Sequence, residues 1–276
     1  MPLRAATSIT ASLAAVLAPA FGLSASPAAA AATPPPARSA HAPVAVMRDK
    51  LPDMAMLPLT TCTRTGAKPR CKPFHIQDYK GHKLLRFSTI AENPGPGRLE
   101  VVASRPNRRV SDLTVVQNIY QTDGRIRRMP TRAVARYASQ DGHDHFHVLD
   151  FMEMRLRPVG SNNTPRGGHK EGFCLVDDWQ DVRHVAEHSH YSGCGGGKPK
   201  RLTVKEGLTP GFVDDYAWNL WGQYIYLDGL RLPGDFCVSG TVDPRGLFKE
   251  KTRSNNTASA LVRITSKDAR LIRQGC

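Results

Sequence analysis

The segment "LTVVQNIYQTDGRIRRMP", residues 113–130, is the part of the sequence that predicts the fold most clearly. Before its turn the segment is rich in β-branched residues and carries one aromatic residue, a composition that favours an extended strand. Asp123-Gly124 follows, a dipeptide that readily adopts the positive backbone angles of a tight turn. The chain then resumes as "RIRRMP", so the segment predicts a β-hairpin of two antiparallel strands.

The rest of the chain repeats this pattern of short β-rich runs between strong turn signals. "HKLLRFSTIAE" (82–92) meets "NPGPG" and continues as "RLEVVAS" (98–104), which predicts a second hairpin. Later runs are "HFHVLDFMEMRL", "GHKEGFCLVD", "GQYIYLDGL", "DFCVSGTVDP" and "TASALVRITS". Helical periodicity is weak throughout. We therefore expect an all-β protein: a disulfide-stapled antiparallel β-sandwich of two packed sheets, with short helices and long loops.

The N-terminal residues 1–32 carry one early arginine, an apolar middle and a closing alanine run, which together predict a secretory signal peptide. The apolar part is short and interrupted by prolines, and no later segment offers about 18 unbroken apolar residues, so no transmembrane segment is expected. Residues 33–50 form a Pro/Ala-rich stretch that predicts a flexible leader. Residues 51–276 are long enough to form one large domain with its own hydrophobic core, and we expect a single domain. The expected location is extracellular or associated with the cell envelope.

The six cysteines of the chain are Cys62, Cys71, Cys174, Cys194, Cys237 and Cys276. An even number in an exported chain favours disulfides over free thiols, and the lack of a C-x-x-C motif argues against a zinc ribbon. We expect the first and second cysteines to pair, and the third and fourth, because each pair closes a short loop. The last two then pair by elimination. After the first bridge, the other four cysteines still allow three connectivities, so this assignment leaves alternatives open.

The formal net charge of +14 predicts attraction to anionic surfaces, and an anionic cell-envelope polymer is the partner of this kind that an exported chain would meet. Nucleic acid is not expected as a partner. The basic residues are scattered, as in "RPNRRV" and "KPKR", and do not follow an aromatic-bearing recognition element. Only "RIRRMPTRAVAR", residues 125–136, is dense in arginine, and a solvated loop explains it equally well.

A second informative segment is "DGHDHFHVLDF", residues 141–151. If it is a strand, the alternate residues His143, His145 and His147 leave one face at intervals of about 6.7 Å and can lean onto one ion. We favour a metal site over a solvated polar face because neutral imidazole is the commonest metal-binding side chain. The spacing does not identify the metal, since imidazole suits Zn, Cu, Fe and Ni alike.

A competing histidine group, His184, His188 and His190, lies in "RHVAEHSHY". In a helix, His184 and His188 would share one face and could form a metal pair. The segment lies between two cysteines and runs into the glycine-rich "GCGGGKPK". We therefore interpret it as a surface loop.

Downstream of the strand histidines come "GHK" (168–170), "FCL" (173–175), and "GLTPG" (207–211) leading to Asp214 and Tyr216. Together with "RSNNTASALVRI" near the C-terminus, these motifs resemble the catalytic domain of lysyl oxidases in order and spacing. The similarity covers most of residues 51–276. Phe212, where the animal enzymes have a cysteine, and the "WNLWGQY" segment indicate a secreted bacterial-type member.

This resemblance implies Cu(II) bound by His143, His145 and His147, and a lysine tyrosylquinone cofactor formed from Lys170 and Tyr216. It also implies oxidative deamination of primary amines, peptidyl lysine among them, to aldehydes. Molecular oxygen would be the oxidant, and ammonia and hydrogen peroxide the other products. Lys170 must be neutral to react, so burial or a neighbouring cation has to lower its pKa.

Asp214, two residues from Tyr216, is our expected general base, and His169 is its rival. A protein with a large positive charge repels cationic substrates, so we also expect a local acidic rim around the site. The candidates for this rim are Asp177, Asp178, Asp214 and Asp215.

Two other functions stay open. The protein could be an exported, non-catalytic copper- or zinc-binding module, or a metal hydrolase with a carboxylate base beside the ion. Lys170 and Tyr216 distinguish these functions from an amine oxidase, because neither alternative explains why both residues accompany the histidines.

Overall fold

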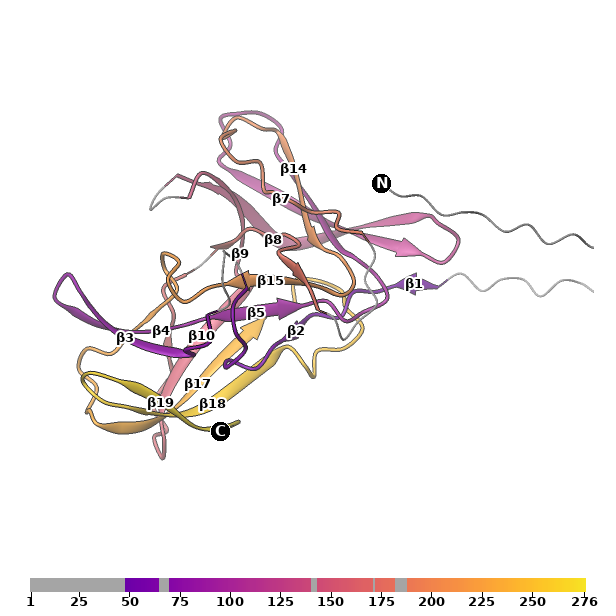
Figure 1. Cartoon of the computed structure of the whole chain (residues 1–276). Coiled ribbons are helices and arrows are strands. Elements are labelled where there is room, and N and C mark those ends of the chain that lie inside the picture. Colours follow the sequence, from indigo (N-terminus) through magenta and orange to yellow (C-terminus); the bar gives the residue numbers. More distant parts are fainter. Residues whose placement is uncertain (1–47, 65–69, 140–142, 171, 182–187) are drawn as a thin grey trace, which may run out of the picture. The chain divides into compact units, whose positions relative to one another are not determined.

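The computed structural model describes residues 48–64, 70–139, 143–170, 172–181 and 188–276 (Figure 1). These residues form 19 strands in four sheets, and every strand pair within the sheets is antiparallel. The all-β prediction is confirmed. The expected short helices do not occur in the part of the chain that the structure describes. Accordingly, no described residue belongs to an apolar helix that could cross a membrane.

The hairpin predicted from residues 113–130 lies inside a seven-stranded sheet. Tyr120 pairs with Ile126 across the turn, and Gly124 has a φ of 85°, which favours glycine. The sheet contains, in order, β12 (Gly172–Phe173), β9 (His145–Leu149), β8 (Ile126–Ala138), β7 (Asp112–Gln121), β6 (Leu99–Ser104) and β14 (Thr203–Leu208), and β1 (Asp49–Lys50) pairs with β7.

The structure has three further, smaller sheets, so the prediction of two packed sheets was wrong. One has the order β11 (Arg166–Gly167), β10 (Met152–Pro158), β17 (Gly234–Val242), β18 (Thr257–Ile264) and β19 (Ala269–Gln274). The next has β13 (Trp179–Gln180), β15 (Phe212–Tyr216), β5 (Thr89–Glu92) and β2 (Ala55–Met56). The last has β16 (Ile225–Tyr226), β4 (His82–Phe87) and β3 (Phe74–Tyr79). Figure 1 shows β15 and β5 between β8 and β9 on one side and β10 and β17 on the other.

The second predicted hairpin, across "NPGPG", was wrong. β5 pairs with β2 and β15, whereas β6 pairs with β7 and β14. The loop between them packs against the chain near Lys50, since a Cβ at Gly97 would lie 1.9 Å from the Lys50 carbonyl oxygen. The Asn93 side-chain amide also donates hydrogen bonds to the carbonyl oxygens of Gly97 and Leu208. The Pro/Gly segment therefore carries the chain from one sheet to another.

The run "HFHVLDFMEM" is divided between β9 and β10, which belong to different sheets. The division falls at Asp150, whose φ of 58° interrupts the extended conformation. Its carboxylate forms an ion pair of 2.9 Å with Arg245. This turn leaves the histidine-bearing strand at one side of the seven-stranded sheet.

Two large hydrophobic cores lie between the sheets, and a third, smaller cluster contains Leu57, Ile90 and Val213. The first joins the seven-stranded and four-stranded sheets and includes Leu99, Val101, Leu113, Phe146, Phe173 and Tyr216. The second joins the five-stranded and three-stranded sheets and includes Phe74, Leu85, Phe236 and Val262. Full burial of one such large apolar side chain contributes about 1.5–3 kcal/mol. Tyr216 thus belongs to the same core as Phe146 of the histidine-bearing strand.

All three predicted disulfides are confirmed: Cys62–Cys71, Cys174–Cys194 and Cys237–Cys276. The second of these ties the chain after Lys170 to the loop that precedes β14. In that loop, the Cys194 carbonyl oxygen accepts a hydrogen bond of 2.8 Å from the Phe146 N–H. The bridge therefore joins two segments that flank the candidate site.

Candidate metal centre and the adjoining lysine and tyrosine

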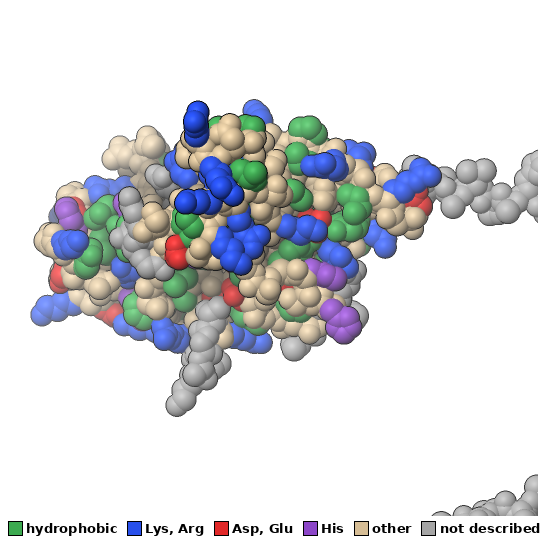
Figure 2. All heavy atoms as spheres, turned by 90° about the horizontal axis from the view of Figure 1, so that it is seen from above, with side chains coloured by type: hydrophobic (Ala, Val, Ile, Leu, Met, Phe, Trp, Pro, Cys, Tyr) green, Lys and Arg blue, Asp and Glu red, His purple; other side chains and the backbone are tan. Residues whose placement is uncertain are grey.

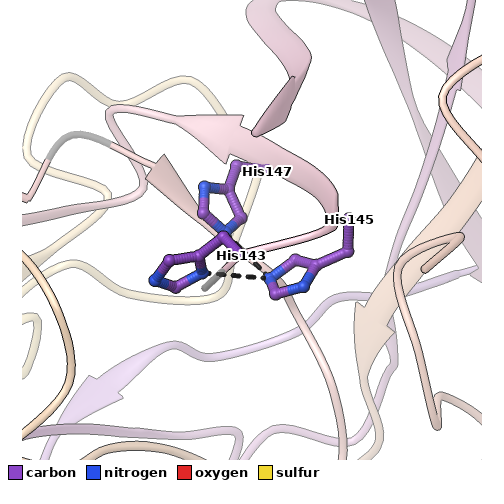
Figure 3. A group of neighbouring side chains, drawn as sticks. All are labelled: His143, His145 and His147. Atoms are coloured by element: carbon purple, nitrogen blue, oxygen red, sulfur yellow. Dashed lines mark hydrogen bonds between the residues drawn. The ribbon is translucent and has the colours of Figure 1, made fainter. Parts of the chain in front are cut away.

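Three imidazole rings converge at the start of β9 (Figure 3). The Nε2 atoms of His145 and His147 lie 2.9 Å apart, and His143 Nδ1 lies 3.5 Å from His145 Nε2. One ring nitrogen from each histidine lies within 4.8 Å of the other two. Metal–imidazole bonds of about 2.0–2.1 Å at a right angle place two nitrogens about 2.9 Å apart. The three rings therefore suit one shared ion.

The strand alternation explains most of this convergence. His145 and His147 lie on one face of β9, and Phe146 between them is fully buried on the other. His143 lies just before the strand, so the strand begins later than the sequence predicted. The ring of His143 still meets those of its two neighbours, with centroids 5.2 and 4.9 Å away.

β12 approaches this group closely because residue 172 is a glycine. Gly172 pairs with Leu149 of β9. A Cβ at position 172 would lie 2.8 Å from the Cβ of His147 and 3.0 Å from its Nδ1. Any side chain there would displace the imidazole. The sequence analysis missed this positioning residue, although a glycine inside a strand often marks a close approach.

Burial keeps the imidazoles in the form that binds metals. Desolvation, with a smaller contribution from the charge of Lys170, lowers the pKa of His147 to about 2. Burial also lowers the pKa of His145. Both rings are therefore neutral near pH 7, with a nitrogen lone pair free for a metal.

Lys170 is buried against aromatic rings, and 7% of its surface is exposed. Its Nζ lies 5.3 Å from the ring centroid of Tyr216 and 5.3 Å from that of Phe173. Burial lowers the pKa of Lys170 to about 8, against the opposite effect of the Asp214 carboxylate. A large fraction of this amine is therefore neutral in mildly alkaline solution.

Tyr216 ends β15 and is held in one orientation. Its hydroxyl donates a hydrogen bond of 2.5 Å to the Cys174 carbonyl oxygen. Its ring lies edge-on to Phe173, with centroids 4.7 Å apart. Burial, and then the charge of Asp214, raises the pKa of Tyr216 well above its usual value. The phenol is therefore protonated near pH 7.

The two aspartates before Tyr216 point in opposite directions, because β15 is extended. Asp215 accepts a hydrogen bond of 3.0 Å from the Trp179 indole N–H. Asp214 lies on the same face of the strand as Tyr216, and its Oδ2 is buried without a hydrogen-bond partner among the described residues. Burial raises the pKa of Asp214 well above its usual value, and the charge of Lys170 partly offsets this.

A pocket of about 390 Å³ opens onto Lys170. Its wall includes His143, His147, Leu149, His169, Lys170 and Trp221. His169 is exposed and stacks on Tyr224, with ring centroids 4.9 Å apart. Its backbone N–H donates to the Tyr224 carbonyl oxygen at 3.0 Å, which fixes the residue before Lys170.

The prediction of an acidic rim around the site was wrong. Asp214 and Asp215 are 1% and 3% exposed, and neither they nor Asp177 and Asp178 line this pocket. The Asp177 carboxylate instead accepts hydrogen bonds from the backbone N–H and the hydroxyl of Thr209. Of the described residues that line the pocket, none is acidic.

Residues 102–276 match the model of the lysyl oxidase family. This region holds the three histidines, Lys170 and Tyr216, and it is more than half of the chain. The chain belongs to the lysyl oxidase family.

Similar proteins include the protein-lysine 6-oxidases of Rattus norvegicus, Gallus gallus and Sus scrofa. The rat protein is 27% identical over 198 residues, which cover 70% of this chain and 38% of the rat protein. The chicken protein is 28% identical, with 70% and 37% covered. The pig protein is 26% identical, with 70% and 62% covered. This lysyl oxidase family member thus spans less than two thirds of the length of each of these relatives.

Glu206 is a further buried acid in this member of the lysyl oxidase family, and the sequence analysis did not assign it. Its Oε2 accepts a hydrogen bond of 3.2 Å from the Leu175 N–H, and its Oε1 has no partner among the described residues. Burial raises the pKa of Glu206 to about 8. Its negative charge would act on both Asp214 and Tyr216. The sequence did contain a signal for its burial. In the strand "TVKEGL" alternate residues face inward, which places Glu206 on the same buried face as Val204.

The second histidine group does not form a metal cluster among the described residues. His188 and His190 are exposed and belong to no group of metal-ligating side chains found there. His184 lies outside the described residues.

Proposed function

We propose that this protein is a secreted, copper-dependent oxidase of primary amines, with peptidyl lysine as a substrate class. The reaction converts the amine, oxygen and water to an aldehyde, ammonia and hydrogen peroxide. Family membership supports this proposal, and so do the relatives, which are named protein-lysine 6-oxidases. The predicted signal peptide and the three disulfides support an exported protein in an oxidising compartment.

The observation that carries the proposal is the contact between Lys170 and Tyr216. A buried lysine with a lowered pKa, 5.3 Å from the centroid of a buried tyrosine ring, suits the formation of a lysine tyrosylquinone. Neither a metal-binding module nor a hydrolase needs such a pair. A hydrolase would also need a carboxylate beside the ion, and the histidine group of the described residues includes none.

The donor set of three neutral imidazoles fits Cu(II), for which His143, His145 and His147 would be the ligands. The copper and the quinone together would supply redox chemistry with oxygen and an electrophilic carbonyl for the amine. The other residues bind, orient and transfer protons. Burial around Lys170 and Tyr216 excludes water from the reacting groups.

Asp214 is the proton acceptor that the geometry favours. It shares a strand face with Tyr216, and burial raises its pKa, so its ionised form is a strong base. His169, the rival, lies at the exposed wall of the pocket. We assign His169 to substrate contact together with Trp221, which is 39% exposed and lies edge-on to it at 5.1 Å.

An assay of copper-loaded protein with a primary amine tests this proposal. Aldehyde and hydrogen peroxide should appear in equal amounts, and Tyr216→Phe should abolish both while copper stays bound. Products formed equally by the Tyr216→Phe variant would contradict the proposal. So would a wild-type protein that binds copper and produces neither.

A further inference from the structure

We propose that an exposed basic groove, separate from the amine pocket, binds an anionic polysaccharide. The groove lies between the loop after β6, residues 105–111, and the loop before β14, residues 195–202. Its five cations, the groove cations, are Arg108, Arg109, Lys198, Lys200 and Arg201. All five are exposed.

Two adjoining hollows form the groove. They measure about 490 and 540 Å³ and share Arg108 and Leu202 as a common wall. The first is lined by Arg109 as well, and the second by Lys198, Lys200 and Arg201. No acidic residue of the described chain lines either hollow. Such a double hollow suits successive units of one polymer better than a single small anion.

The groove cations have no anionic partner within the described part of the protein. Arginines elsewhere do find such partners: Arg136 pairs with Asp112 at 2.6 Å, and Arg155 pairs with Glu153 at 2.8 Å. None of the five groove cations forms an ion pair with a described residue. Figure 2, the view from above in Figure 1, shows Lys and Arg gathered on this face with few acidic side chains among them. Their charge is therefore available to an external anion.

The two loops are held together, so the groove exists before any ligand binds. The guanidinium of Arg105 donates hydrogen bonds to the carbonyl oxygens of Arg201, Val110 and Pro199. Its backbone N–H donates to the Leu202 carbonyl oxygen at 3.0 Å. A preformed site loses less conformational entropy when a chain binds.

The lining favours a sugar polymer over nucleic acid or membrane. Single-stranded nucleic acids bind on aromatic side chains, and no aromatic residue of the described chain lines either hollow. A membrane presents a flat surface, which would leave the two hollows empty. Guanidinium and ammonium groups pair well with the carboxylate, sulfate or phosphate groups of an acidic polysaccharide.

The groove lies behind the histidine-bearing strand. The Gly197 N–H donates a hydrogen bond of 2.8 Å to the Asp144 carbonyl oxygen, and the Phe146 N–H donates to Cys194. A Cβ at Gly195 would lie 3.2 Å from the Phe146 ring, and a Cβ at Gly197 would lie 3.7 Å from the Asp144 carboxylate. These two side chains alternate with the histidines, so the groove adjoins the face opposite the metal ligands. A bound polymer would therefore tether the protein and leave the amine pocket open.

Binding of the full chain to dextran sulfate, with neutral dextran as the control, tests the proposal. We expect binding that weakens steeply as salt rises, because contacts between cations and polyanions release counterions. Arg108→Ala/Lys200→Ala should weaken it by at least about tenfold. The matched control, Lys267→Ala/Arg270→Ala, removes the same charge from exposed residues at the β18–β19 end of the chain and should weaken binding by less than about twofold.

Equal losses in the two double variants would overturn the proposal, because total charge would then explain the binding. Tighter binding of single-stranded DNA of equal charge would also overturn it, in favour of a nucleic-acid surface. Binding to anionic phospholipid vesicles without binding to dextran sulfate would overturn it in favour of a membrane. Amine oxidation should be unchanged by the groove substitutions, and saturating dextran sulfate should not compete with a small amine substrate.

Discussion

The Nζ of Lys170 lies 5.3 Å from the centre of the Tyr216 ring, although the two residues belong to parts of the chain associated with different sheets. Lys170 lies just before β12 at the edge of the seven-stranded sheet, and Tyr216 ends β15 in the four-stranded sheet. Phe173 contacts both, at 5.3 Å from Nζ and 4.7 Å from the Tyr216 centroid. The pair is therefore positioned by the packing between the two sheets, with Phe173 in contact with both residues.

Replacing the central histidine tests the metal site. His145→Ala should weaken copper binding by more than about 100-fold, since even the loss of a residue that supports a ligand costs about 10–100-fold. Titration with Cu(II) followed by calorimetry measures this. His188→Ala is the control, because His188 is exposed and outside the histidine group. Loss of copper affinity in His188→Ala but not in His145→Ala would contradict the assignment of His143, His145 and His147 as the metal ligands.

Gly172→Ala should also weaken copper binding, although residue 172 offers no ligand atom. The added Cβ would lie 2.8 Å from the Cβ of His147, so the imidazole must move. Overpacking of this kind costs about 1–3 kcal/mol of stability. Gly167→Ala is the matched control, because a Cβ there meets no atom within 4 Å. Copper titration of both variants should separate them, and equal affinities would show that the close approach is unimportant.

Glu206 should by itself make the metal-free protein less stable as pH rises from about 4.5 to about 8. Burial raises the pKa of Glu206 from 4.5 to about 8, so in this window the unfolded chain loses a proton that the folded chain keeps. Glu206→Gln should therefore remove up to about 1.4 kcal/mol per pH unit of this decline. Urea unfolding at several pH values measures the slope. The control is Glu153→Gln, since Glu153 is half-exposed and pairs with Arg155, and this variant should keep the wild-type slope. A wild-type slope in Glu206→Gln would refute the claim that Glu206 has a raised pKa.

Asp214→Asn should lower kcat by about 10²–10⁴-fold, the usual contribution of a general base. Copper affinity should stay the same, because Asp214 is not among the metal-ligating group. His169→Ala should act mainly on KM, since His169 is an exposed residue of the pocket wall. Steady-state kinetics of the two variants decide between them. The reverse pattern would make His169 the base.

The sequence predicted the local features of this molecule well and the long-range ones poorly. The Asp123-Gly124 hairpin and the alternation of His145 and His147 follow from neighbouring residues, whose geometry is fixed by turn type and strand pleat. The "NPGPG" segment failed as a hairpin because its partner is the chain near Lys50, which local composition does not reveal. Likewise, β9 ends at Leu149 because the next residue, Asp150, has a positive φ, which the surrounding run of strand-forming residues does not reveal.

Among the site residues, too, the sequence identified some and missed those whose role depends on tertiary packing. Lys170 and Tyr216 were identified through a family resemblance, since a single lysine or tyrosine has no distinctive spacing. The acidic rim failed because Asp214 and Asp215 continue a strand that is buried on both faces. Gly172 and Glu206 were missed because their roles depend on what packs against them, His147 in one case and Leu175 in the other.

The most direct test of the proposed cofactor is peptide mapping after copper loading in the presence of oxygen. Digestion followed by mass spectrometry should yield one cross-linked pair of peptides that contains Lys170 and Tyr216. Formation should be faster at pH 9 than at pH 7, because burial lowers the pKa of Lys170 to about 8 and the neutral amine is the reactive form. Lys170→Met should bind copper and give no cross-linked pair. Separate, unmodified peptides from a wild-type preparation that still oxidises primary amines would contradict the account.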